Sequence, residues 1–120
     1  MTEFKPFLNR DEIHCLVVDI ADRISCDYEN IDLVLVGVLK GSFIFLSDLV
    51  RQLTIPVEID FVGACSYGTD VQSSENIQLT KPLQIDIRNK YIIIIEDIVD
   101  TGLTLAYLID YIKSFEPNRM

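Results

Sequence analysis

The chain has 120 residues, 49% of them hydrophobic, which is enough to bury one hydrophobic core and short for two domains. Nineteen acidic and ten basic side chains give a formal net charge of −9, which disfavours nucleic acids and anionic membranes as general electrostatic partners. The three cysteines include no C-x-x-C pair and no stretch approaches the length of a membrane span, so the sequence predicts one soluble, cytoplasmic domain over residues 1–120.

The first predicted helix begins at Asn9. Asn9 and Glu12 have the spacing of a capping box, in which a side chain satisfies a free amide of the first turn. Apolar side chains then recur at three- and four-residue steps: Ile13, Leu16, Val17, Ile20, Ala21 and Ile24. This spacing predicts one apolar stripe along an amphipathic helix that packs against the rest of the domain.

A buried strand and a second helix follow. Residues 33–39 form a continuous apolar run, which is typical of a strand covered on both faces. A wide apolar helix face comes next, and Pro56 leads into an extended segment at 57–62. The helix face consists of Phe43, Phe45, Leu46, Leu49, Val50 and Leu53. Strand, helix and strand in this order predict a parallel sheet.

The second half of the chain contains a polar loop, a strand and a last helix. Residues 66–76 are polar, and two interpretations are open for them: a lid over a site, or a slack surface hairpin. A return strand is predicted at Ile77, Leu79 and Leu83, then a buried strand at 92–95. A final helix, with Leu105, Leu108, Ile109 and Ile112 on its apolar side, ends before Pro117. The predicted fold class is α/β, with a doubly wound, mainly parallel sheet.

An acidic cluster follows the isoleucine strand. Glu96, Asp97 and Asp100 come where an open parallel sheet binds ligands, and their mutual repulsion favours a divalent metal such as magnesium, or a sugar diol. Residues 101–104 open a helix, whose free amides and positive dipole suit a phosphate. Together these features predict a sugar phosphate as ligand. A solvated acidic loop with Thr101 as a helix cap is the plainer alternative.

Other patterns are less informative. No Walker loop is present in the sequence, and a receiver domain would carry its paired acids after the first strand rather than the last. Lys40 fits a ligand role better than that of a solvated turn lysine, since Gly41-Ser42 follows it. We expect His14 to be structural and Cys65 to be an inert thiol.

Three segments resemble one known family, the type I phosphoribosyltransferases, in the form of hypoxanthine-guanine phosphoribosyltransferase. Residues 94–105 resemble its phosphoribosyl pyrophosphate (PRPP) motif. Residues 36–43, with 48–51, resemble its pyrophosphate loop and following helix, and Asp60-Phe61 with 66–68 resembles the start of its mobile loop. The resemblance implies the type I phosphoribosyltransferase fold, incomplete at the C-terminus because the segment that grips the purine is lacking.

The resemblance also implies site residues. Glu96 and Asp97 would bind the ribose hydroxyls of PRPP, directly or through Mg²⁺, and Asp100 would be the general base or acid near purine N7. Lys40 and Gly41 would meet the pyrophosphate, with a cis peptide between Leu39 and Lys40. The 5′-phosphate turn would comprise Ile98, Val99, Asp100, Thr101, Gly102, Leu103 and Thr104, and the lid would contain Ser66 and Tyr67.

The implied activity is purine salvage by an enzyme. Phosphoribose would pass from PRPP to hypoxanthine or guanine with Mg²⁺, giving IMP or GMP and pyrophosphate. The enzyme would be a homo-oligomer, either a dimer or a tetramer, and would bind neither nucleic acid nor membrane. One departure is Glu75, where the family usually has glycine after the paired serines of the lid. A non-catalytic regulator on the same fold, or an inactive truncated fragment, is the alternative.

Overall fold

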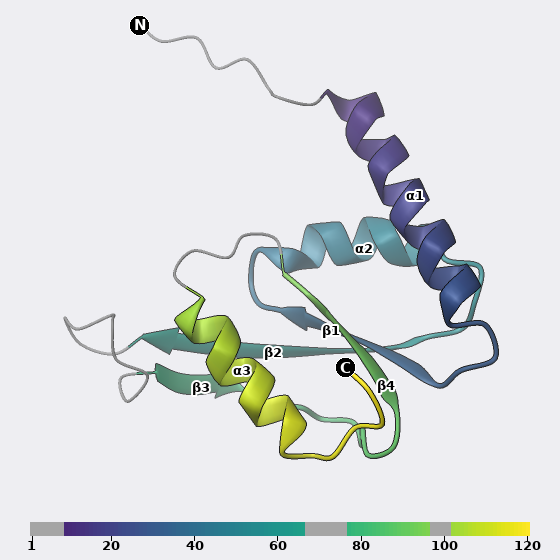
Figure 1. Ribbon diagram of the computed structural model, residues 1–120. Coiled ribbons are helices and arrows are strands. Elements are labelled where there is room, and N and C mark those ends of the chain that lie inside the picture. The colour runs from purple at the N-terminus through teal and green to yellow at the C-terminus, as the bar shows by residue number, and fades with distance from the viewer. Residues whose placement is uncertain (1–8, 67–76, 97–101) are drawn as a thin grey trace, which may run out of the picture.

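The computed structural model describes residues 9–66, 77–96 and 102–120 (Figure 1). Its elements in chain order are α1 (Arg10–Asp27), β1 (Leu33–Val38), α2 (Ser42–Gln52), β2 (Glu58–Ser66), β3 (Ile77–Lys81), β4 (Tyr91–Ile95) and α3 (Leu103–Lys113). Within these ranges, none of the helices has the length and apolar character needed to cross a membrane. Cys15, Cys26 and Cys65 are exposed free thiols.

The strands form one sheet in the order β3-β2-β1-β4. β1 pairs in parallel with both β2 and β4, while β3 runs antiparallel to β2. α1 and α2 lie together over one face of this sheet, and α3 covers the other face (Figure 1). The predicted α/β fold, with a doubly wound and mainly parallel sheet, is therefore confirmed.

β1 lies at the centre of the hydrophobic core. All six of its residues are buried. Leu33 and Leu35 pack with α1 and α2, whereas the intervening valines pack with α3, because successive side chains of a strand point to opposite faces. A Cβ atom at Gly37 would lie 2.9 Å from side-chain carbons of Leu46 and Phe61. Glycine at this position allows α2 and β2 to pack closely against β1.

The prediction for α1 is right about the cap and wrong about half of the stripe. The Glu12 amide donates to Asn9 Oδ1 at 2.8 Å. Val17, Ala21 and Ile24 are buried against α2 and the sheet. The other three apolar side chains, Ile13, Leu16 and Ile20, are 48%, 48% and 38% exposed. Only one narrow line of α1 therefore packs against α2 and the sheet. The rest of the predicted apolar stripe faces away from these elements.

β2 is longer and β3 is shorter than the sequence predicts. β2 continues to Ser66 because residues 63–66 pair with β3. β3 ends at Lys81, so the prediction is wrong for Leu83, which lies beyond the strand. The Leu83 amide instead donates to the Tyr111 hydroxyl of α3 at 3.1 Å. Residues 67–76, the rest of the predicted lid or surface hairpin, lie outside the described residues.

Asp60 holds the connection between β3 and β4. Its side chain is only 6% exposed and accepts hydrogen bonds from the amides of Phe61, Gln84 and Ile85 at 2.8, 2.7 and 3.2 Å. The Lys81 ammonium lies 3.2 Å from Asp60 Oδ1. Burial by itself raises the pKa of this carboxyl group, but the three amides and the ammonium outweigh burial, so the pKa lies below its ordinary value.

The C-terminal residues lie along the other edge of β4. α3 ends at Lys113, four residues before Pro117. The Ile92 amide donates to the Arg119 carbonyl oxygen at 2.8 Å, and the Asn118 amide donates to the Lys90 carbonyl oxygen at 2.8 Å. Arg119 thereby forms a parallel bridge with Tyr91. This pairing places the end of the chain on the side of β4 that faces away from β1.

We predict that Asp60→Asn lowers the free energy of unfolding at pH 7 by about 1–3 kcal/mol, because buried amides lose an acceptor. The stabilisation from the charged carboxylate is fully present above about pH 4 and is lost as the pH falls through the lowered folded-state pKa. The difference between the two proteins should therefore shrink in urea titrations performed at steps from pH 7 to pH 3. Asp22→Asn, at an exposed position of α1, is the control. Equal stability of the two variants at pH 7 would contradict the anchoring role of Asp60.

Candidate functional site

The carboxyl ends of β1 and β4 meet at one edge of the sheet. Gly37 is paired with Ile95, so the next residues, Val38 and Glu96, reach that edge at the same level. Lys40 then follows β1 by two residues, and Glu96 follows β4 directly. Two segments far apart in the sequence are thus side by side where an open parallel sheet binds its ligands.

The turn between β1 and α2 has a specific backbone geometry. The peptide bond between Leu39 and Lys40 is cis, as the family resemblance implies. Ser42 is fully buried, and its hydroxyl donates to the Val38 carbonyl oxygen at 2.5 Å. The Leu39 amide donates to the Val62 carbonyl oxygen at 2.9 Å. The turn is therefore fastened to β1 and β2, while the Lys40 side chain is exposed.

Sequence reasoning missed the structural role of Ser42. The sequence pattern indicates Ser42 only as a neighbour of Lys40, whereas its buried hydroxyl closes the turn by bonding the Val38 carbonyl oxygen. A small hydroxyl residue between a glycine and an apolar helix face is the signal that could have found it, because such a side chain can bond the carbonyl four residues earlier.

α3 begins at the same edge. Gly102 has a φ angle of 83°, a left-handed conformation that glycine adopts without steric cost, and it carries no side-chain cap. The Ala106 amide donates to the Gly102 carbonyl oxygen at 2.9 Å, which starts the helix. The first turn, with Leu103 and Thr104, presents the positive end of the helix dipole, and such an end suits a phosphate group.

Part of the predicted site lies outside the described residues. Asp97, Ile98, Val99, Asp100, Thr101 and the lid residue Tyr67 belong to this part. Of the predicted ligand residues, the structure brings Lys40, Gly41 and Glu96 to one edge of the sheet. Residues 102–104, which are also predicted ligands, form the start of α3. Ser66 ends β2. Their roles in binding stay predictions.

No group of three or more His, Cys, Asp or Glu side chains that could hold a metal ion occurs among residues 9–66, 77–96 and 102–120. Glu96 supplies one carboxylate at the strand end, and carboxylate oxygen is the donor type that Mg²⁺ prefers. Of the two predicted metal ligands, Glu96 therefore has the chemistry that suits magnesium, and Asp97 lies outside the described residues.

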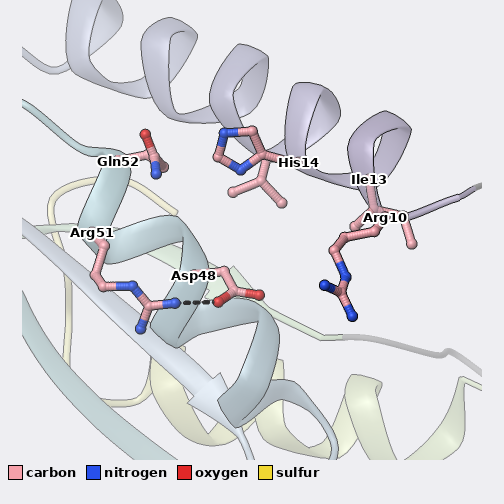
Figure 2. Close-up of a pocket in the computed structure, with 7 residues that line it drawn as sticks. Arg10, Ile13, His14, Asp48, Arg51 and Gln52 are labelled. Atoms are coloured by element: carbon pink, nitrogen blue, oxygen red, sulfur yellow. Dashed lines mark hydrogen bonds and ion pairs between the residues drawn. The ribbon is translucent and has the colours of Figure 1, made fainter.

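A cavity is present elsewhere, between α1 and α2 (Figure 2). Its lining includes Asp48 and Arg51, which form an ion pair. Asp48 lies seven residues beyond Gly41 along α2, so it is about 10 Å from the turn after β1. None of the described residues that line the cavity is a predicted ligand residue of the strand-end site.

The model of the phosphoribosyl transferase domain family matches residues 8–120. The chain belongs to this family. Hypoxanthine phosphoribosyltransferase of Haemophilus influenzae is 40% identical over 113 residues, and the match covers 92% of this chain and 63% of that protein. Hypoxanthine-guanine phosphoribosyltransferase of Dictyostelium discoideum is 42% identical over 113 residues, covering 91% and 63%.

Solved structures give the same result for the fold of this phosphoribosyltransferase chain. A hypoxanthine-guanine phosphoribosyltransferase from Bacillus anthracis, solved with a HEPES molecule in its active site, has a TM-score of 0.88 at 36% identity, covering 98% of this chain and 70% of the other. A hypoxanthine phosphoribosyltransferase from Staphylococcus aureus also has a TM-score of 0.88, at 34% identity, covering 96% and 62%. The family resemblance stated from the sequence is thereby confirmed. The chain spans less than two thirds of the length of the curated relatives named above.

We predict that Gly102→Ala costs about 1–2 kcal/mol of unfolding free energy, because a side chain is strained at a φ angle of 83°. Gly41→Ala is the matched control, since Gly41 has a φ angle of −61°, which alanine adopts readily. Urea denaturation of both variants measures the difference. Equal stability of the two alanine variants would show that the conformation at residue 102 is not strained.

Proposed function

We propose that this chain forms the PRPP-binding core of a purine salvage enzyme, a hypoxanthine-guanine phosphoribosyltransferase, with residues 1–120 as one domain. The observation that carries the proposal is the meeting of the β1 and β4 ends, with Lys40 and Glu96 at one edge and the start of α3 following. The names of the relatives support the choice of acceptor, hypoxanthine or guanine.

The proposed reaction follows from the chemistry of the predicted residues. The bond between C1′ of PRPP and its pyrophosphate breaks, a bond from C1′ to purine N9 forms, and Asp100 takes the proton from purine N7. Lys40 and Gly41 bind the departing pyrophosphate. Residues 98–104 hold the 5′-phosphate through backbone amides and the hydroxyls of Thr101 and Thr104.

Two further groups complete the proposed site. Positive charge develops on the sugar as pyrophosphate departs. The carboxylates of Glu96 and Asp97, at the motif positions that the family resemblance assigns to the ribose, would hold its hydroxyls. Mg²⁺, held by the same two carboxylates, would neutralise charge on PRPP. Ser66 and Tyr67 would belong to a lid that excludes water, so that hydrolysis of PRPP does not compete with transfer.

We further propose that the protein is cytoplasmic and assembles as a homodimer or homotetramer. We propose that neither nucleic acid nor a membrane is its partner. The exposed apolar side chains Leu16, Ile20, Phe43 and Ile44 support an assembled state, because association would remove them from water. The net charge of −9 supports small, metal-complexed anions rather than polyanions as ligands.

Binding of PRPP with Mg²⁺ is the first test. We predict saturable heat of binding in a calorimetric titration, and about tenfold weaker binding by Thr104→Ala, which loses a hydroxyl donor to the 5′-phosphate. Thr104→Ser retains the hydroxyl and should bind as the parent does. A folded chain that gives no heat with PRPP, or an alanine variant that binds like the serine variant, would contradict the proposed phosphate turn.

Transfer itself is tested with PRPP, Mg²⁺ and hypoxanthine or guanine, by following the purine absorbance as the nucleotide forms. We predict that Asp100→Asn lowers kcat roughly 10²–10⁴-fold, the usual contribution of a general base, with little change in PRPP affinity. Binding of PRPP without transfer by the parent chain would instead support the alternative, a non-catalytic or truncated form of the fold.

A further inference from the structure

Two helices enclose a second candidate site. A cavity of about 530 Å³ lies between α1 and α2, within the range of small-molecule sites, roughly 300–1,000 Å³. Ile13 and Val17 give it an apolar wall, and the other lining residues are Arg10, His14, Asp48, Arg51 and Gln52. Figure 2 shows Arg10 and His14 reaching from α1 towards Asp48 and Gln52 on α2.

The charges in this cavity differ from those of the chain as a whole. Asp48 is the one carboxylate among the lining residues, and it is paired with Arg51. Arg51 is further fixed by a hydrogen bond of 2.8 Å from its Nη1 to the Ser47 hydroxyl. In a chain of net charge −9, the cavity therefore keeps an excess positive charge from Arg10.

Three polar side chains remain available for a ligand. In the part of the chain that the structure describes, the side chains of Arg10, His14 and Gln52 make no hydrogen bond or ion pair. Guanidinium and carboxamide N–H groups are donors, and an imidazole can donate as well. Arginine binds phosphate through two parallel N–H donors, which favours a tetrahedral oxyanion as the polar part of the ligand.

The apolar wall adds a second requirement. Ile13 is 48% exposed although it lines the cavity, so its side chain can still lose contact with water to a bound molecule. A bare inorganic anion would leave this surface in water. An organic anion, with a phosphate on Arg10 and an apolar body against Ile13 and Val17, would use both parts of the cavity.

We infer that the cavity between α1 and α2 is a binding site for a small organic phosphate, held by Arg10, His14 and Gln52 over the apolar wall of Ile13 and Val17. The inference does not depend on the proposed transferase activity, since none of the described residues that line the cavity is a predicted ligand residue of the strand-end site. Arg51 and Asp48 are paired with each other and so supply no net charge to the ligand.

His14 provides a local reporter for the test, because it is the only histidine in the chain. Phenyl phosphate is titrated into the full chain at pH 7 while the His14 imidazole proton resonances are followed by NMR. We expect a saturable shift, with inorganic phosphate binding more weakly because it lacks the apolar body. Arg10→Gln should weaken phenyl phosphate binding about tenfold or more, the loss of a charge-assisted hydrogen bond.

Arg23→Gln is the matched control. Arg23 is exposed on the same helix and lies outside the cavity lining, so its removal makes the same change in net charge and should leave the titration unaltered. The inference is overturned if phenyl phosphate leaves the His14 resonances unmoved, or if Arg10→Gln and Arg23→Gln weaken binding equally. Equal binding of inorganic and phenyl phosphate would also overturn it, since the apolar wall would then contribute nothing.

Discussion

The parallel pairing of β1 on both of its sides is the constraint on which the rest of the structure depends. One register brings Val38 level with Val62 of β2, and the other brings Gly37 level with Ile95 of β4. A shift by one residue would turn the valines of β1 towards α1 and α2 and its leucines towards α3. Since both faces of β1 are buried, the hydrophobic core fixes the register, and the register in turn fixes where the chain leaves the sheet.

This constraint explains how an apolar framework can position polar side chains. Lys40 follows β1 by two residues and Glu96 follows β4 directly, so the packing of these two strands fixes where both residues leave the sheet. On the other side of β2, the buried carboxylate of Asp60 takes the place of apolar packing. It fixes residues 81–85 through hydrogen bonds. The core and the buried carboxylate together set the frame around the strand ends.

The sequence predicts the elements well because their patterns are local. The apolar run of β1, the cap at Asn9 and the apolar side of α3 each lie within a short window, and the structure confirms them. Features that depend on distant contacts were harder to predict. The exposure of Ile13, Leu16 and Ile20 depends on which line of α1 meets α2, and the length of β2 depends on pairing with β3.

The site divides in the same way. The positions of Lys40, Glu96 and Gly102 could be predicted because each follows or opens a regular element, and their roles in binding stay predictions. The buried hydroxyl of Ser42 and the hydrogen bonds of Asp60 could not, since their partners are set by the tertiary fold. The cavity between α1 and α2 was missed for the same reason: Arg10 and Asp48 are 38 positions apart, and only the packing of the two helices brings them together.

We propose that PRPP binds where the carboxyl ends of β1 and β4 meet the start of α3. The most direct measurement is a ¹H–¹⁵N correlation spectrum of the labelled chain, recorded as PRPP and Mg²⁺ are added. We expect the largest shifts at the amides of Lys40, Gly41, Glu96 and residues 102–104, and no shifts in β3 or in the C-terminal half of α1. Shifts confined to the cavity between α1 and α2, with the strand ends unmoved, would contradict it.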